Sequence, residues 1–254
     1  MLFFVYINDI NINIESDIKL FADDTTLIKA IDNNDPFDIL NNDLERLNKW
    51  SVQWRITFIN PNTTEFLIFS NKVSHQTVYT ALYLNRIRLK EVDEHKHIGL
   101  ILSKNLSWRK HITEICKKAN KHLDVMFRMK RLLPRICLEK LYKTIVRPIL
   151  DYGDMLYDNC LNYESEFFEK VQRRAAILSM GAFKITKHID LLNELGLSPL
   201  HIRRKIHRLT LFYKIKIKQY PNYLSDSCPL VNHNTENYNL RRKDFVLPLI
   251  YIHV

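Results

Sequence analysis

The spacing of apolar residues changes character partway along the chain. Up to residue 103 they fall in short runs typical of strands, and beyond it they recur every three or four positions, as in amphipathic helices. Strands followed by helices predict an α+β fold rather than an alternating one. The expected domains are residues 1–103, carrying an antiparallel sheet, residues 104–219, all helical, and residues 220–254, an irregular tail rich in asparagine.

The first domain is expected to contain a hairpin, a helix and a sheet. Residues 18–31 predict a β-hairpin whose polar turn holds Asp23 and Asp24. Residues 35–54 predict an amphipathic helix, and short apolar runs between 56 and 102 predict an antiparallel sheet with one covered face. The buried face of the helix is expected to hold Leu40, Leu44, Leu47, Trp50 or Ser51, and Trp54.

The second domain is expected to consist of helices separated by proline and glycine. Ser107 is the predicted cap of a long helix, which Pro134 ends. Pro148 is expected to break the helix that follows, because proline lacks the N–H and collides with the preceding turn. Two more helices are predicted at about residues 163–180 and 199–219.

Charge is concentrated in particular segments. The net charge is +10, but residues 104–147 and residues 170–218 each carry a net +10, and residues 148–169 between them carry −6. Basic clusters of this size are typical of a polyanion-binding surface, and counterion release makes such binding salt-dependent. The alternative is a pair of solvated helix faces without a partner, while the lack of an aromatic insertion face disfavours a membrane surface. The expected nucleic-acid contacts are Arg109, Lys110, Lys117, Lys118, Lys121, Arg128, Arg131, Arg173 and Arg174.

Several basic residues are adjacent in the sequence, which limits how many can act together. Arg173 with Arg174, and Arg203 with Arg204 and Lys205, are such groups. Neighbouring residues on a helix point apart, so only some members of each group can face one phosphate backbone.

Composition excludes several common classes of protein. The four glycines form neither a dinucleotide-binding fingerprint nor a phosphate-binding loop, and no serine lies in a nucleophile elbow. The four cysteines are far apart, which favours reduced thiols in an intracellular protein, either nuclear or cytoplasmic. No apolar run reaches the roughly 20 residues that a spanning helix needs, so no membrane partner is expected.

Asp23 and Asp24 are the residues most suggestive of chemistry. Adjacent carboxylates in a tight turn repel each other, and a hard divalent cation removes that cost. A carboxylate-held metal beside a phosphate-binding surface would indicate phosphoryl transfer. Taken alone, however, an Asp-Asp pair is also common in exposed turns, and that reading stays open.

The wider sequence resembles one family over most of its length. Phe21 to Asp24, FADD, resembles the F/Y-A-D-D box that forms the third palm motif of reverse transcriptases. The same order of motifs is typical of non-LTR retrotransposon reverse transcriptases of the LINE type, jockey-like branch. The other matching segments are Leu2 to Ile10 (LFFVYINDI), Trp50 to Ser70 around the fourth motif, His97, Ile98 and Gly99 in the primer-grip position, and 105–180 in the thumb region.

The resemblance implies an RNA-directed DNA polymerase, which extends a DNA primer on an RNA template with deoxynucleotides. It implies a partial palm over residues 1–103 and a thumb and connection over residues 104–219. Asp23 matches a carboxylate that holds catalytic Mg²⁺ or Mn²⁺, and Asp24 matches its neighbour, so both are candidate catalytic and metal-binding residues. The family's two-metal chemistry would pass the primer hydroxyl to the nucleotide between those ions.

Several departures from the family pattern limit this prediction. The fingers and the first two palm motifs, including a further metal-binding carboxylate, are not found, and Asp9 does not fit that role. Thr63 stands where the family has lysine, and His97 where tyrosine is usual. The apolar opening, Met1 to Ile7, is typical of a core, so we expect a truncated gene model or a decayed copy. Such a fragment is expected to be inactive by itself; the alternative is a non-catalytic nucleic-acid-binding remnant that uses the basic helices.

Two pairs of side chains offer weaker candidates. His95 and His97 would share a face in a strand, a spacing that occurs in zinc sites, but no nearby residues complete a tetrahedral set. Trp50 and Trp54 are one helical turn apart and could stack on bases, although packing in the core is favoured.

Overall fold

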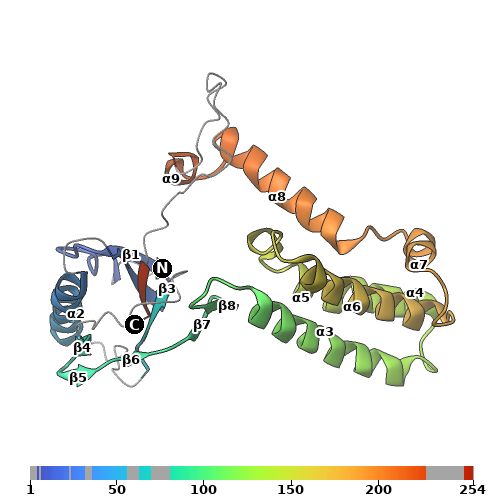
Figure 1. Ribbon diagram of the computed structural model, residues 1–254, viewed down its shortest axis with the longest axis horizontal. Helices are drawn as coiled ribbons and strands as arrows, with labels where there is room; N and C mark the ends of the chain where they lie inside the picture. Colours follow the sequence, from blue (N-terminus) through green and yellow to red (C-terminus); the bar gives the residue numbers. More distant parts are fainter. Residues whose placement is uncertain are drawn as a thin grey trace. The chain divides into compact units, whose positions relative to one another are not determined.

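The computed structural model describes residues 5, 7–22, 24–31, 36–55, 63–69, 81–226 and 249–253. The chain divides into two compact units. Unit 1 comprises Met1–Ser107 together with Arg241–Val254, and unit 2 comprises Trp108–Leu240. Unit 1 is therefore assembled from both ends of the sequence, whereas unit 2 is one continuous stretch (Figure 1).

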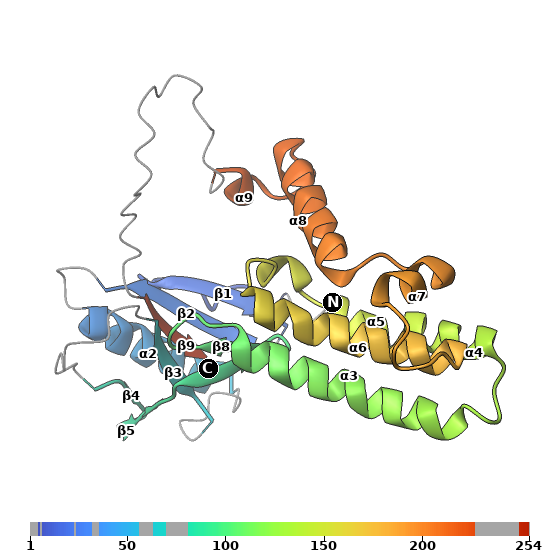
Figure 2. The same cartoon turned by 45° about the vertical axis from the view of Figure 1, so that its right-hand side comes forward.

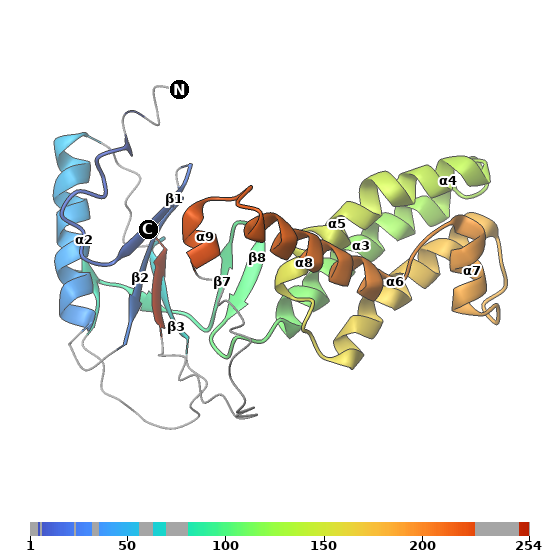
Figure 3. The same cartoon turned by 90° about the horizontal axis from the view of Figure 1, so that it is seen from above.

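The centre of unit 1 is a five-stranded sheet whose middle strand comes from the end of the sequence. Residues 249–253, which were expected to belong to an irregular tail, form this strand and pair antiparallel with a neighbour on each side (Figure 3). The sequence did not reveal it, because four apolar residues and a histidine behind an asparagine-rich stretch have no pairing partner nearby in the sequence. Across the sheet, the strands are β1 (Asp17–Phe21), β2 (Asp24–Ala30), β9 (Leu249–His253), β3 (Glu65–Phe69) and β6 (Lys90–Glu91).

One long helix, α2 (Pro36–Gln53), supplies much of the core of unit 1. Its leucines at 40, 44 and 47 are fully buried, as the apolar spacing predicts. They belong to the same core cluster as Leu27 of β2 and Ile252 of β9. Trp50 packs partly against this core, whereas Trp54 remains 37% exposed. The predicted helix is therefore confirmed, and its apolar face extends no further than Trp50 and Ser51.

The predicted single antiparallel sheet is instead three sheets. Among the described residues, two small hairpins form two-stranded sheets of their own. In the central sheet, β6 pairs with β3 in parallel rather than antiparallel. The chain runs through one hairpin before it reaches β6, so it returns beside β3 in the same direction. The predicted runs at 56–62 and 70–80 lie outside the described residues. The hairpins are β4 (Tyr83–Leu84) with β5 (Ile87–Arg88), and β7 (Glu94–His97) with β8 (Leu100–Ser103).

Unit 2 is helical throughout its described part, as the periodicity predicts. Its two longest helices lie side by side and share one core with the shorter ones (Figure 2). The helical segments are α3 (Arg109–Met129), α4 (Arg135–Leu141), η1 (Tyr142–Val146), α5 (Arg147–Asp151), η2 (Asp154–Leu156), α6 (Asn162–Met180), α7 (His188–Leu195), α8 (Leu200–Lys216) and α9 (Asn222–Asp226).

Two local predictions in unit 2 are wrong. Pro148 does not break its helix, because the preceding turn η1 widens to a π-helix and the helical run continues from α4 into α5. A π-turn avoids the bond that proline cannot make. Ser107 does not cap α3: the capping position is Trp108, which makes no side-chain capping bond. The backbone N–H of Ser107 instead donates to Oδ1 of Asn105 at 3.0 Å.

None of the helices in the described part of the chain combines the length and apolar character needed to cross a bilayer.

Candidate functional site

The Asp23–Asp24 turn lies at the tip of the β1–β2 hairpin. Phe21 pairs with Asp24 across the strands, so only Ala22 and Asp23 connect them. Ala22 has a φ of 53°, the left-handed conformation that two-residue hairpin turns require. Asp24 is half-buried at the start of β2, and Asp23 lies outside the described residues. The hairpin is thus tightly connected, and its second strand begins with a half-buried carboxylate, that of Asp24.

Tyr251 of β9 connects this hairpin to the segment compared with a primer grip. Its hydroxyl lies 3.4 Å from Oγ1 of Thr26. Burial and the nearby Asp24 carboxylate raise the pKa of Tyr251 to about 12, so the hydroxyl stays protonated. On the same side of the strand, the rings of His95 and His97 lie 5.6 and 5.5 Å from the Tyr251 ring, centroid to centroid. The structure therefore brings two predicted site segments to one face of the sheet.

The segment His97, Ile98 and Gly99 forms the turn of the β7–β8 hairpin. His97 pairs with Leu100, which leaves Ile98 and Gly99 as the two connecting residues. Both have positive φ, 45° and 80° respectively. A β-branched residue such as Ile98 rarely adopts this conformation, because its side chain crowds the backbone. Such strain is often found at functional turns and is a reason to test this one.

The described residues do not assemble a metal site. No group of three or more histidines, cysteines, aspartates or glutamates lies together among them. His95 and His97 flank a tyrosine, and Nδ1 of His95 is 3.4 Å from the Glu65 carboxylate, so they do not form a tetrahedral zinc set. A two-metal centre needs more carboxylates than Asp24 alone provides.

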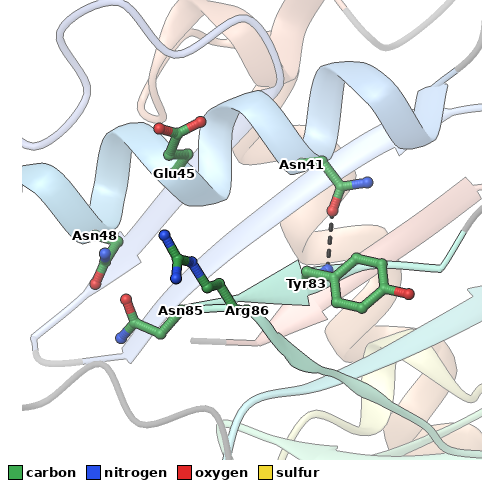
Figure 4. A pocket seen from close by; sticks show the side chains of 6 residues that line it. All are labelled: Asn41, Glu45, Asn48, Tyr83, Asn85 and Arg86. Carbon is green, nitrogen blue, oxygen red and sulfur yellow. Dashed lines mark hydrogen bonds between the residues drawn. The ribbon is translucent and has the colours of Figure 1, made fainter.

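A polar hollow of about 730 Å³ opens between α2 and the β4–β5 hairpin (Figure 4). Asn41 joins its two walls: its Oδ1 accepts from the Tyr83 N–H at 2.9 Å, and its Nδ2 donates to the Ala81 carbonyl at 3.2 Å. The turn residues Asn85 and Arg86 face the helix from the other side, both with positive φ. None of the residues predicted to be functional lines this hollow, and the Asn41 amide fixes the hairpin to α2.

A groove of about 340 Å³ runs between α3 and α6 in unit 2. Lys117 of α3 and Arg174 of α6, both predicted nucleic-acid contacts, line it together with Lys170. The Arg174 guanidinium donates to Oδ1 of Asn120 at 2.9 Å and also pairs with Asp124. The remaining lining residues are Thr113, Cys116, Asn120, Phe167 and Val171.

The cations of this groove are held by exposed, weak ion pairs. Lys117 lies 2.9 Å from Glu114, and both side chains are largely exposed. Exposed pairs contribute roughly 0–1 kcal/mol, so a phosphate could replace such a partner at little cost. Burial raises the pKa of the Cys116 thiol on the groove floor to about 12, which leaves it protonated and unreactive. The groove therefore presents three cationic side chains, those of Lys117, Lys170 and Arg174, beside an unreactive thiol.

A line of basic residues extends along the exposed side of α3. Each residue of a helix is rotated by about 100° from the one before, so positions separated by seven, four and seven residues lie on one face. The first and the last of four such positions are 18 residues apart, or roughly 27 Å along the helix. The four residues on this face, called the α3 basic face below, are all exposed. They are Lys110, Lys117, Lys121 and Arg128.

The remaining predicted contacts are distributed more widely. Arg173 is half-buried, and its Nη2 donates to the carbonyls of Lys184 at 2.7 Å and Thr186 at 2.9 Å. It therefore holds the segment after α6, while the adjacent Arg174 turns toward the groove, as expected for neighbours on a helix. The other predicted contacts that the structure places at the surface are Arg109, Lys118 and Arg131.

The three arginines of α8 are engaged inside unit 2, whereas its lysines are exposed. Arg203 lies 2.8 Å from the Asp151 carboxylate, and Arg208 lies 2.9 Å from that of Asp158. Arg204 is only 3% exposed; it donates to Ser165 at 2.6 Å and covers the Phe168 ring at 4.6 Å. The expectation that both basic segments face a polyanion is thus wrong for these arginines.

The acidic partners form a row that the sequence analysis overlooked. Asp151, Asp154 and Asp158 are spaced by three and four residues in the acidic segment, and in a helix this spacing places side chains on one face. The Asp154 carboxylate is fully buried and lies 2.7 Å from Nδ1 of His207. Its burial raises the pKa of Asp154 above the ordinary value, although the His207 bond acts in the opposite direction.

Two known proteins are similar to most of this chain. A protein named RNA-directed DNA polymerase from mobile element jockey, of Drosophila funebris, is 25% identical over 212 residues, which cover 82% of this chain. A probable RNA-directed DNA polymerase from transposon X-element, of Drosophila melanogaster, is 19% identical over 223 residues, or 86% of the chain. Over most of its length the chain is thus similar to the RNA-directed DNA polymerases of two mobile elements.

The chain spans about a quarter of the length of each of these two proteins. The matches cover 22% of the jockey protein and 24% of the X-element protein. No family model matches the chain. No solved structure matches it either. The resemblance stated from the motifs is therefore supported at the level of the family, and the residue roles stay predictions.

Proposed function

We propose that this chain is a fragment of an RNA-directed DNA polymerase of a mobile element. The supporting observation is its similarity to two such polymerases over more than four-fifths of its length. In the intact protein, the partners are an RNA template, a DNA primer and deoxynucleotides. Unit 1 acts as part of the palm, and unit 2 acts as the thumb and connection.

In this proposal, Asp23 and Asp24 are the carboxylate pair that holds Mg²⁺ or Mn²⁺ in the intact enzyme. The remaining carboxylate comes from the first palm motif, which is not among the motifs found in this chain. Because a primary ligand is lacking, most of the electrostatic stabilisation of the transition state is lost. We therefore expect no polymerisation by this chain alone.

The proposed contribution of unit 2 is to bind the nucleic-acid backbone through the α3 basic face and the α3–α6 groove. Six lysines and arginines occur between residues 109 and 129, against two acidic residues. Their exposed ion pairs can be exchanged for phosphates, and binding should weaken steeply as salt rises. A surface of this kind needs no metal, which also supports the second candidate function, a non-catalytic nucleic-acid-binding remnant.

The binding proposal is tested by measuring the affinity of the full chain for a labelled RNA–DNA duplex at several salt concentrations. Lys117→Glu with Lys121→Glu changes the α3 basic face. Lys205→Glu with Lys214→Glu on α8 is the matched control, because it makes the same charge change at exposed positions. Each lost phosphate contact should lower the slope of log affinity against log salt by about 0.9, so the first pair should lower it by about 2. Equal slopes for both pairs would contradict the α3 surface.

The catalytic proposal is tested by primer extension and by metal binding. The full chain should not extend an annealed primer in the presence of Mg²⁺ and deoxynucleotides. Extension would show that its own residues suffice, which would contradict the expected inactivity. Mn²⁺ titration followed by electron paramagnetic resonance should show binding that Asp23→Ala removes and Asp38→Ala, on α2, preserves. Binding that survives Asp23→Ala would assign the hairpin no metal role.

A further inference from the structure

The middle strand of the central sheet is supplied by a segment remote in the sequence. Ala30 of β2 pairs with Leu249 of β9, and Phe69 of β3 pairs with the same residue on the other side. Five positions of β9 pair with each neighbour. Because the sheet order is β1–β2–β9–β3–β6, removing β9 would leave β2 and β3 with unpaired edges facing each other. We call this space between β2 and β3 the β9 slot.

Both faces of β9 contribute to unit 1. Ile252 is fully buried in the core cluster with Leu27 of β2 and Phe66 of β3. Tyr251, on the opposite face, is 5% exposed and contacts the rings of His95 and His97. A strand that fills the β9 slot must therefore supply backbone hydrogen bonds on both edges and two particular side chains.

We propose that the β9 slot is a strand-acceptor site whose partner is the β9 strand of a second copy of this chain. Two copies would each place β9 in the slot of the other and form a reciprocal, strand-exchanged dimer. Such an interface is symmetric: each copy donates its β9 strand to the other copy and receives the other copy's β9 strand in return. The proposal concerns self-association and does not depend on the polymerase family.

The contacts of β9 make this exchange inexpensive. A strand from a second copy makes the same backbone hydrogen bonds and buries the same Tyr251 and Ile252 as the strand of the first copy. The connection from α9 to β9 comprises residues 227–248, 22 residues, whose fully extended length is at most roughly 75 Å. The choice between closed and exchanged forms therefore depends on protein concentration.

A second copy suits the slot better than an unrelated extended segment. Backbone pairing alone would accept many strands, as in other cases of strand addition. Here the inserted strand must also place an aliphatic side chain beside Leu27 and an aromatic hydroxyl within reach of Thr26. The β9 sequence meets both requirements in adjacent positions, Tyr251 and Ile252, and every copy carries it.

The test uses pairs of full-length variants, each of which carries one added cysteine. Lys29 lies opposite Ile250 in the β2–β9 register, and Thr26 lies opposite His253. Antiparallel partners have Cα atoms about 4.5–5.5 Å apart, which suits a disulfide. Lys29→Cys and Ile250→Cys chains, distinguished by tags, are mixed, unfolded, refolded together and oxidised. Thr26→Cys with His253→Cys is the second pair, in case one variant of the first fails to fold.

Two controls accompany the mixture. Each single variant treated alone reports any linkage through the native cysteines. A mixture of Lys29→Cys with His253→Cys chains has cysteines that are not register partners, so it reports non-specific linkage. Peptide mass spectrometry identifies which residues are joined.

Exchange predicts a covalent dimer joined through residues 29 and 250, absent from both controls. A tenfold dilution before refolding should lower its fraction about tenfold while the dimer is the minor species. The chain carrying both cysteines should link internally at low concentration. If it does so while no mixture yields a dimer at any concentration, the slot accepts only its own strand and the proposal is overturned. Failure of the doubly substituted chain and of both mixtures to link would also overturn it, since β9 would then not occupy the slot.

Discussion

Helices α3 and α8 each carry six lysines and arginines, yet the structure uses them in opposite ways. On α3 the basic residues are exposed, and Lys117 pairs with a neighbour at the surface, Glu114. On α8, Arg203, Arg204 and Arg208 contact the acidic residues that precede α6, and Arg204 is buried. One helix leaves its charge at the surface, while the arginines of the other form ion pairs within unit 2.

The difference shows that net charge per segment is an incomplete guide to a binding surface. Residues 104–147 and 170–218 have the same net charge, +10. What separates them is the acidic segment, net −6, which the fold brings against α8. Partly buried pairs are screened less by salt than exposed ones, so they are harder to exchange for phosphate.

Arg204→Ala should destabilise unit 2 by about 3 kcal/mol, because it leaves buried polar groups without their partner. Lys118→Ala, an exposed position on α3, should change stability by less than about 0.5 kcal/mol. Urea unfolding followed by circular dichroism measures both. A similar, small effect at the two positions would show that the α8 arginines are not structural.

Asp151→Asn with Asp158→Asn should release Arg203 and Arg208 and raise affinity for the RNA–DNA duplex. If the released arginines reach phosphates, affinity at low salt should rise roughly tenfold and the salt slope should steepen by up to about 2. Glu45→Gln with Asp38→Asn in unit 1 makes an equal charge change and is the control. A rise of the same size in the control would indicate a general effect of net charge.

Asp154→Asn should change how stability responds to pH. Burial raises the pKa of Asp154 above its ordinary value of 3.8, so the folded state binds this proton more tightly than the unfolded state. Its stabilising contribution is present below pH 3.8 and is lost as pH rises through the folded pKa. Relative to the unsubstituted chain, the variant should therefore gain stability as pH rises from about 4 to 7. A constant difference in Tm across that range would count against a raised pKa.

His111→Gln should have the smallest effect, and it should act in the opposite direction with pH. Burial lowers the pKa of His111 below its ordinary value of 6.5. The stabilising contribution is present above pH 6.5 and is lost as pH falls through the folded pKa. The Tm of the unsubstituted chain should therefore fall more than that of the variant between about pH 7 and 5. Equal decreases in the Tm of the variant and of the unsubstituted chain would show that other groups cause the loss of stability at low pH.

Much of the local structure follows directly from the sequence. The leucines of α2 lie on the predicted buried face, and the polar turn in residues 18–31 lies in a β-hairpin. Helix periodicity also located α6 and α8 to within a few residues. These features depend on interactions between residues close in sequence, which is why a pattern of residue types is sufficient to predict them.

The candidate site was predicted less completely. The sequence predicted Asp23, Asp24 and the segment at His97 as site residues, and these roles stay predictions. It also related the chain to polymerases of the kind that the comparisons find. It did not identify Tyr251, which joins the Asp24 hairpin to His95 and His97. Tyr251 lies more than 150 residues from His97 along the chain, and a local sequence pattern does not reveal contacts between segments so far apart.

The sequence by itself determined the α+β class, the amphipathic helices, the carboxylate turn and the distribution of charge. Only the tertiary structure decided that a strand from residues 249–253 completes the central sheet and that the α8 arginines are paired with Asp151 and Asp158. The physical reason is the same in both cases. Strand pairing and ion pairing depend on which segments meet in space, and that choice is made by the burial of the whole core rather than by any one segment.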